Sequence, residues 1–427
     1  MARTKKEAAL TPEERLQAAL VSDWEWSYKL PENWCWTYFK SISTIQTGKK
    51  DANYGSDEGK YPFFTCAAEP IRCHGYSFDC RAILLAGNGD INNISRYNGK
   101  FEAYQRTYVV KIAEPLRFDY IFYWFKYRWF DFNKGKMFGT AIPYIRLGNL
   151  QEFPTPIPPL AEQQRIVDRI ESLFAKLDEA KEKAQAVVDS FETRKAAILH
   201  KAFTGELTAK WREEHGVSID NWKTTRFDSV AAIRSNLVDP AEYQSFPHIA
   251  PDNIEKKTGV LLEYHTIAED GVTSGKHRFY SGQILYSKIR PYLSKAVVVD
   301  FDGLCSADMY PIEAYQNARC LWYYMLSDEF LLQASTAGSR SVLPKINQKE
   351  LSALTVHLPT NDREQEEIAR ILDELFDKEQ QSKEAAEAVL DQIELMKKSI
   401  LARAFRGELG TNDPNEESAV ELLKQII

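Results

Sequence analysis

Several hallmarks of secreted and membrane proteins are missing from this sequence. Its 427 residues include only six cysteines, too few for a disulfide framework. No stretch approaches the roughly 20 apolar residues needed to span a bilayer. The first residues turn from basic to acidic and have no apolar core like that of a signal peptide. We therefore expect a cytoplasmic protein with reduced thiols and no contact with a membrane.

The motifs of several enzyme classes are also missing. There is no Asn/Asp-Pro-Pro-aromatic motif of an adenine methyltransferase and no P-loop, and the glycines of 87–92 lack the dinucleotide-binding spacing. Cys66, Cys73, His74 and Cys80 lie close together, but their spacing matches no common zinc pattern. We expect neither a catalytic centre nor a metal site in this chain.

An excess of positive charge is absent as well. The net charge is −7, and residues 359–427 carry 9 basic and 17 acidic side chains, whereas residues 1–156 carry 21 and 17. Because phosphate binding needs a local basic face rather than a basic protein, this composition neither supports nor excludes a nucleic-acid partner.

What the sequence does contain is an internal duplication. Residues 162–207 align without a gap onto residues 364–409, and 21 of the 46 positions are identical. Weaker similarity lies upstream, where Pro143 matches Pro344. The order is therefore variable module, constant module, variable module, constant module. We place their boundaries at residues 1–156, 157–212, 213–358 and 359–427.

The two constant modules have the pattern of long helices. Apolar or small residues alternate at steps of four and three, the 3.5-residue period of a coiled coil. In the first copy they are Ile166, Ile170, Leu173, Leu177, Ala180, Ala184, Val187, Phe191 and Ile198. In the second they are Ile368, Leu372, Leu375, Ala386, Val389, Ile393, Met396 and Ile400, interrupted at Glu379 and Ser382.

About 40 helical residues make a rod of roughly 60 Å, and its apolar seam must be covered by another helix. A coiled coil between two chains is one solution. We favour antiparallel pairing of the two copies within one chain, because the chain already supplies both helices at high effective concentration.

The variable modules mix strand-like runs with Gly- and Asn-rich turns, which predicts mixed α/β domains with mostly β cores. We predict an α+β fold in which two such domains are separated by the two long helices. The aromatic run of residues 118–132 is expected to form a buried helix.

Polar loops are expected at 87–100, 133–136, 274–282 and 286–295. Their Arg, Lys and Asn side chains suit the reading of DNA bases, although ordinary surface loops have a similar composition. The candidate DNA-binding residues are Asn88, Asn92, Asn93, Arg96, Tyr97, Asn98, Lys100, Lys134, Lys136, Lys276, His277, Arg278, Lys288, Arg290, Tyr292, Lys295, Ser339, Arg340 and Lys345.

Specific motifs mark both copies of the duplication. They are PPLAEQQRIVDRIESLF (158–174), EQEEIARILDELF (364–376), the endings KAFTGEL and RAFRGEL, LPENW (30–34) and the GTAIP segment before the first helix. With these motifs, the chain resembles the specificity subunits of type I restriction-modification systems over essentially its whole length.

The resemblance implies a non-catalytic subunit that binds no cofactor itself. Each variable module would be a target recognition domain for one half of a bipartite, asymmetric site in double-stranded DNA, and the paired helices would set the gap between the halves. Two methyltransferase subunits would bring S-adenosylmethionine for adenine methylation. Two restriction subunits would bring ATP and magnesium for cleavage.

Two other interpretations compete with this one. An enzyme with its own chemistry is disfavoured by the missing motifs. An architectural coiled-coil protein with two protein-binding heads is not excluded by sequence alone. Salt would distinguish them, because the affinity of a DNA reader falls steeply with ionic strength.

Overall fold

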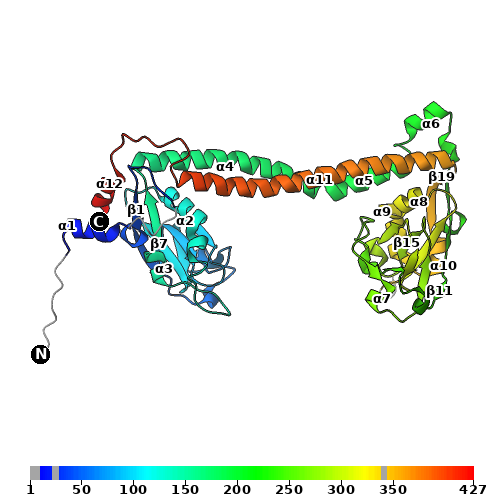
Figure 1. The fold of residues 1–427 in the computed structure, drawn as a ribbon, viewed down its shortest axis with the longest axis horizontal. Coiled ribbons are helices and arrows are strands. Elements are labelled where there is room, and N and C mark those ends of the chain that lie inside the picture. Colours follow the sequence, from blue (N-terminus) through cyan, green and yellow to red (C-terminus); the bar gives the residue numbers. More distant parts are fainter. Residues whose placement is uncertain (1–9, 22–27, 338–343) are drawn as a thin grey trace. The chain divides into compact units, whose positions relative to one another are not determined.

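The computed structural model describes residues 10–21, 28–337 and 344–427, and the chain forms two compact units (Figure 1). Unit 1 comprises Met1–Lys183 and Val389–Ile427, and unit 2 comprises Ala184–Ala388. Each unit combines a β-rich domain with a stretch of paired long helices, so the predicted α+β class is confirmed. In the described ranges, no helix has both the length and the apolar character required to cross a membrane.

The β-rich domain of unit 1 is built on a six-stranded sheet. Its order is β2 (Ser43–Thr47), β7 (Thr107–Ile112), β5 (Phe78–Ala86), β6 (Ile94–Ala103), β3 (Tyr61–Phe64) and β4 (Ile71–Cys73). All neighbours are antiparallel except β3 and β6. A second, two-stranded sheet pairs β1 (Cys35–Tyr38) with β8 (Pro154–Ile157) and so joins the two ends of the domain.

The aromatic run forms α2 (Phe118–Asn133), and the prediction of a buried helix is confirmed. Tyr120 is fully buried, and its hydroxyl donates to the carbonyl of Pro156 at 2.9 Å. The Trp124 ring lies 5.0 Å from the ring of Phe405, which belongs to the RAFRGEL ending. This ending therefore forms part of the core of unit 1.

The two ends of the chain close unit 1. Leu16 of α1 (Pro12–Ala19) and Leu423 of α12 (Ala419–Ile426) are buried in the same apolar core. Arg15 also donates to the carbonyl of Ile427 at 2.9 Å. The short helix α3 (Leu147–Gln151) completes the unit.

Unit 2 divides its strands between two sheets. The first runs β11 (Leu237–Val238), β14 (Lys276–Phe279), β17 (Gly303–Cys305), β12 (Pro247–Ile249) and β13 (His265–Thr266). The second runs β10 (Ala231–Ile233), β18 (Met309–Ala314), β15 (Ile284–Ser287) and β16 (Ala296–Val298). As in unit 1, a separate strand pair joins the ends of the domain, here β9 (Trp222–Arg226) and β19 (Thr355–Pro359). Its helices are α6 (Ala209–His215), α7 (Ile267–Asp270), α8 (Ala318–Met325), α9 (Asp328–Ala337) and α10 (Gln348–Ala353).

The long helices pair antiparallel inside unit 1, where the first part of α4 (Leu160–Asp189) lies along the last part of α11 (Asp362–Ala404). Lys181 reaches Glu394 at 2.7 Å, and Asp178, one turn earlier, pairs with Lys397. Partner numbers rise as the α4 numbers fall, which defines the antiparallel direction.

The same direction holds inside unit 2, between α5 (Phe191–Phe203) and the first part of α11. Arg194 donates to Glu379 at 2.7 Å, and the Lys383 ammonium lies 4.9 Å from the centre of the Phe191 ring. Pairing of the two copies within one chain is thereby confirmed.

The expectation of a continuous first helix is wrong, because α4 ends at Asp189 and α5 begins at Phe191. The Ser190 hydroxyl donates to the carbonyl of Ala186 at 2.6 Å, and Arg194 donates to the carbonyl of Val187 at 3.2 Å. Side chains that bond to helix carbonyls in this way weaken the backbone ladder and bend a helix.

Two members of the second predicted seam, Val389 and Met396, are 41% and 49% exposed. Each stretch of α11 has only one long neighbouring helix, so a single stripe is covered and its flanks stay open. Ile393, between them on the stripe, is buried.

Buried glutamates in the first turn of each long helix attach the helices to the β-rich domains. Glu364, in unit 2, has no exposed side-chain surface. It accepts hydrogen bonds from four side chains at 2.7–3.0 Å, those of Thr208, Arg212, Asn221 and Trp222. Thr208 and Arg212 follow the KAFTGEL ending, so this carboxylate ties the ending of the first copy to the start of the second.

Glu162 is the counterpart in unit 1 and is also fully buried, but it has fewer donors. Thr411 donates to it at 2.6 Å and Arg165 at 3.0 Å. Arg165 is shared, because it also makes two 2.8 Å hydrogen bonds to Glu416.

The pKa values of the two glutamates are therefore shifted in opposite directions. Burial raises the pKa of Glu364, but its hydrogen bonds from Asn221, Arg212, Thr208 and Trp222 outweigh burial and hold the pKa below its ordinary value. For Glu162, burial dominates over the bonds from Thr411 and Arg165 and leaves the pKa raised.

We expect Glu364→Gln to lower the free energy of unfolding of unit 2 by about 2–4 kcal/mol, because Arg212 would keep a buried, uncompensated charge. Glu162→Gln is the matched control in unit 1 and should cost less, since Arg165 keeps Glu416. Urea unfolding followed by hydrogen exchange in peptides of each unit measures both losses.

The pH dependence follows from the lowered pKa of Glu364. Its stabilisation is present above the ordinary glutamate pKa of 4.5 and is lost as the pH falls through the lower folded value. The difference between wild type and Glu364→Gln should therefore shrink below about pH 4.5. Equal losses for both variants at every pH would contradict this assignment.

Candidate nucleic-acid interface

In unit 1, the loop after β5 pairs with the segment that leads into α3. The Gly89 N–H donates to the carbonyl of Pro143 at 2.8 Å, and the Ile145 N–H donates to the carbonyl of Gly87 at 2.9 Å. We call residues 87–93 and 134–146 the unit 1 clasp. It brings together two loops that the sequence indicates separately.

The same arrangement recurs in unit 2. The Arg290 N–H donates to the carbonyl of Pro344 at 2.8 Å, and the Ile346 N–H donates to the carbonyl of Lys288 at 2.9 Å. Each of these four residues lies 201 positions after its counterpart in unit 1. We call residues 288–295 and 344–346 the unit 2 clasp. The candidates Ser339 and Arg340 lie outside the described residues.

The clasps also share a backbone conformation. Gly89 has φ +71°, and Arg290, at the matching position, has φ +46°. Glycine adopts this left-handed conformation freely, whereas a side chain makes it strained. Strained residues of this kind cluster at functional sites, which draws attention to Arg290.

The predicted polar loop 87–100 is shorter than expected, because residues 94–100 lie in β6. Eight residues of β6 pair with β5, so sheet pairing overrides the local turn preference of the Asn and Gly residues. Tyr97 packs against Phe64 in a core cluster, whereas Asn98 and Lys100 are exposed.

Arg96 is held by α2. Its guanidinium donates to Asp119 at 2.5 Å and lies 4.8 Å from the centre of the Phe122 ring. Arg81 binds the other oxygen of the same carboxylate at 2.6 Å. Asp119 therefore neutralises part of this positive charge.

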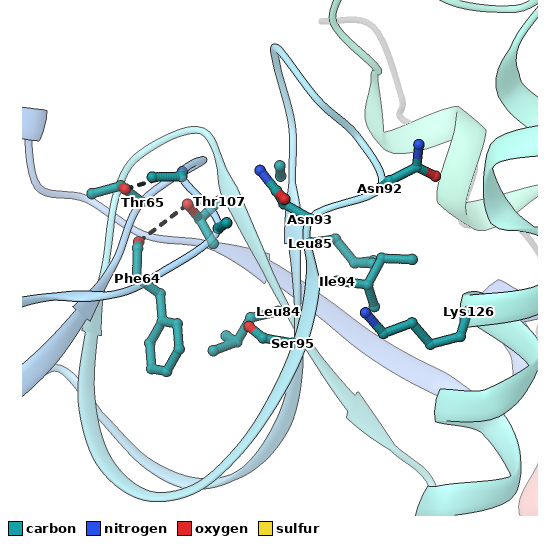
Figure 2. Close-up of a pocket in the computed structure, with 13 residues that line it drawn as sticks. Phe64, Thr65, Leu84, Leu85, Asn92, Asn93, Ile94, Ser95, Thr107 and Lys126 are labelled. Carbon is teal, nitrogen blue, oxygen red and sulfur yellow. Dashed lines mark hydrogen bonds between the residues drawn. The ribbon is translucent and has the colours of Figure 1, made fainter. Parts of the chain in front are cut away.

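Within the unit 1 clasp, Asn92 is exposed, Asn88 is half-buried, and Asn93 donates its amide to the carbonyl of Cys66 at 2.9 Å. Figure 2 shows the cavity of about 170 Å³ beside this loop, with Lys126 extending from α2. Asn93 thus fixes the loop, whereas the Asn92 side chain is exposed.

Cations flank the second arm of this clasp. Lys134 lies 3.4 Å from Asp131, and Lys136 lies 3.6 Å from the centre of the Phe132 ring. Arg146, which is not among the sequence candidates, is exposed and lies 3.9 Å from the centre of the Phe138 ring. Its position directly after the repeated GTAIP segment was the only signal that could have indicated it.

The middle of the expected loop 274–282 is the strand β14 (Lys276–Phe279), whose pairing with β11 and β17 buries its first residues. Lys276 is 6% exposed and donates to the carbonyl and hydroxyl of Ser274, and burial lowers its pKa. His277 is 3% exposed, and Arg278 lies 4.8 Å from the Tyr280 ring. Lys276 and His277 are therefore buried within the domain, and Arg278 packs against an aromatic ring.

Lys295 likewise serves the fold, because it donates to the carbonyl of Pro251 at 2.7 Å. Lys288 donates to the carbonyl of Ala307 at 2.5 Å and lies 3.8 Å from Asp308. These two lysines tie the unit 2 clasp to its neighbours.

Three side chains of the unit 2 clasp face solvent. Arg290 is exposed and has no side-chain partner among the described residues. Tyr292 is 47% exposed, and Lys345 is exposed with its ammonium 3.3 Å from Asp308. Arg290 and Tyr292 on one segment of the clasp and Lys345 on the other are side-chain types that suit an anionic, aromatic ligand.

Comparison with known proteins decides the family. The model of the type I restriction modification DNA specificity domain matches residues 31–188 and 219–390. The type I restriction enzyme EcoDI specificity subunit of Escherichia coli is 40% identical, over 93% of this chain and 95% of that protein. The chain belongs to the family of type I restriction-modification specificity subunits. It is therefore a non-catalytic component of a type I restriction enzyme.

Other members of the specificity subunit family are more distant. The EcoKI specificity subunit of Escherichia coli strain K12 is 25% identical, over 67% of this chain and 66% of that protein. The crystal structure of the HsdS subunit from Thermoanaerobacter tengcongensis matches with a TM-score of 0.57 and 18% identity, over 90% of this chain and 100% of that chain. This second likeness supports the fold of a specificity subunit.

Because Asp308 lies beside Lys288 and Lys345, Asp308→Asn should strengthen binding to non-cognate duplex DNA. We expect an increase of about two- to fivefold at low salt, which disappears at high salt because the charges are screened. Fluorescence anisotropy with a labelled duplex measures it. Asp300→Asn removes an exposed carboxylate of unit 2 outside the clasp, and an equal increase there would argue against a local effect.

Proposed function

We propose that the two β-rich domains are target recognition domains, each reading one half of a bipartite, asymmetric site in double-stranded DNA. The recurrence of the clasp carries this proposal. The two backbone hydrogen bonds of the unit 1 clasp recur in unit 2 at a constant offset of 201 residues, while the side chains that the clasps present differ, as with Asn88 and Ile289 or Tyr144 and Lys345. One scaffold with two sets of side chains is what an asymmetric site requires.

The proposed contacts are drawn from the candidate set, without the residues whose side chains the fold binds or buries. In unit 1 they are Asn88, Asn92, Asn98, Lys100, Lys134 and Lys136, to which Arg146 is added. In unit 2 they are Arg290, Tyr292 and Lys345, with Ser339 and Arg340 kept from the sequence. Lys276, His277 and Lys295 are assigned to the fold instead. Arg and Lys suit guanine and phosphates, and Asn suits adenine.

The remaining assignments extend the family membership. The helical modules at 157–212 and 359–427 would set the gap between half-sites, and the recognition domains would occupy 1–156 and 213–358. Two methyltransferase subunits would supply S-adenosylmethionine for adenine methylation. Two restriction subunits would supply ATP and magnesium for cleavage, in the cytoplasm. This chain would bind no cofactor and direct the others to the site.

The first test is Arg290→Ala in the complex with the methyltransferase subunits. Adenine methylation mapped across a genome first defines the bipartite motif. The variant should then methylate that motif about 10- to 100-fold more slowly, because one arginine–base contact contributes roughly 1–3 kcal/mol.

Arg226→Ala is the matched control, since Arg226 is an exposed arginine of unit 2 engaged by Asp228 at 2.6 Å. It should leave methylation unchanged. Full activity of Arg290→Ala, or an equal loss in both variants, would remove Arg290 from the contact set. Absence of any split motif in the wild type would refute the proposed function itself.

The second test changes the length of the helices. Four residues are inserted after Lys181 and four after Glu394, which face each other in the antiparallel pair. This adds about 6 Å and a net turn of roughly 40°. We expect the motif to keep both half-sites while its gap grows by one or two base pairs.

Insertion after Lys181 alone is the control. It should abolish methylation, because it shifts the apolar residues of α4 out of register with those of α11. Genome-wide methylation mapping gives the motif in each case. An unchanged gap in an active double-insertion variant would contradict the proposal that the helices set the spacing.

A further inference from the structure

The second arm of the unit 1 clasp is a rigid hairpin. Phe138 and Tyr144 exchange backbone hydrogen bonds at 2.9 Å in both directions. Gly139 has φ +83°, and a Cβ there would lie 2.8 Å from the carbonyl oxygen of Ile142, so the turn requires glycine. The pairing of Pro143 with Gly89 adds a further support. The tip of the hairpin is therefore held in place by its backbone.

An isoleucine stands at this tip. Ile142 is 61% exposed, more than any other large apolar side chain among the described residues 28–157. A single exposed apolar residue needs no explanation by itself. Its surroundings supply the second observation.

All charged residues in the chain around the tip are cations. From residue 132 to residue 151 there is no aspartate or glutamate, while Lys134, Lys136 and Arg146 all lie in this stretch. Lys136 and Arg146 are stacked on the rings of Phe132 and Phe138, which keeps both cations at the base of the hairpin. The cations at the base of the hairpin would bind a polyanion. The isoleucine at its tip would then contact an apolar group of the same ligand.

Duplex DNA offers that combination in its major groove. The groove admits a two-stranded ribbon, and the C5-methyl of thymine is the apolar group on its base edges. The half-sites of an adenine-methylating system must contain A·T pairs. We propose that the hairpin 138–144 enters the major groove and places Ile142 against a thymine C5-methyl, so that this residue specifies one A·T pair. The inference rests on the proposed function and adds a specificity residue to it.

The experiment removes the methyl group from the DNA and the side chain from the protein. Each thymine of the mapped motif is replaced singly by uracil, and affinity is measured for the assembled methyltransferase complex. Wild type should lose roughly fourfold at one thymine of one half-site, the effect of one buried methyl group. Ile142→Ala should bind the natural site more weakly and no longer distinguish thymine from uracil at that position.

Two further variants complete the design. Ile142→Val keeps a branched side chain and should keep most of the uracil effect. Ile71→Ala removes another exposed isoleucine of unit 1, on the edge strand β4, and should behave like wild type. Uracil sensitivity that persists in Ile142→Ala, or is absent in a wild type that still recognises its motif, overturns the inference alone. A wild type without any motif overturns the proposed function with it.

Discussion

The attachment of the long helices to the β-rich domains depends on one buried carboxylate in the first turn of each helix. Removing a carboxylate from water costs several kcal/mol unless donors replace the water. For Glu364 those donors come from the segment after the KAFTGEL ending and from Trp222 at the domain's edge. For Glu162 they include Thr411, after the RAFRGEL ending. Each helix start is therefore stable only when the ending of the other copy is in place, so domain and helices fold as one body within each unit.

That attachment leaves the clasps free to vary. Their four backbone hydrogen bonds need no particular side chain, and the left-handed position accepts glycine in one unit and arginine in the other, at a modest cost in strain. Under the proposed function, substitution on the clasp can thus alter what a domain reads without disturbing the buried glutamates. A protein whose function is to discriminate between DNA sequences benefits from this separation between a constant attachment and a variable surface.

How far the sequence could be interpreted follows from the range of the interactions involved. The duplicated seam is local, so the helices and their pairing could be predicted, although the break at Ser190 depends on side-chain bonds that a periodic pattern does not contain. Residues 94–100 include Asn98 and Gly99, and residues 276–279 lie between the Ser-Gly pairs 274–275 and 281–282, so both segments resemble turns in the sequence. Only their distant strand partners make them β-structure. The pairing of Gly89 with Pro143 is equally non-local. Composition could suggest which residue types suit the reading of DNA. It could not show that Lys276 and Lys295 donate hydrogen bonds to carbonyls of their own domain.

This loss of lysines to the fold also bears on how a chain of net charge −7 could act on DNA. Because Lys276 and Lys295 are bonded to carbonyls and Arg96 is paired with Asp119, fewer of the candidate cations are left to bind phosphates. A domain with few phosphate contacts binds DNA weakly away from its target. Affinity must then come from both domains engaging one duplex, since linkage makes the second contact intramolecular only when the half-sites are correctly spaced. Under the proposed function, two weakly binding and unlike domains therefore gain more selectivity than strongly basic ones, because a strongly basic domain would bind any DNA by itself.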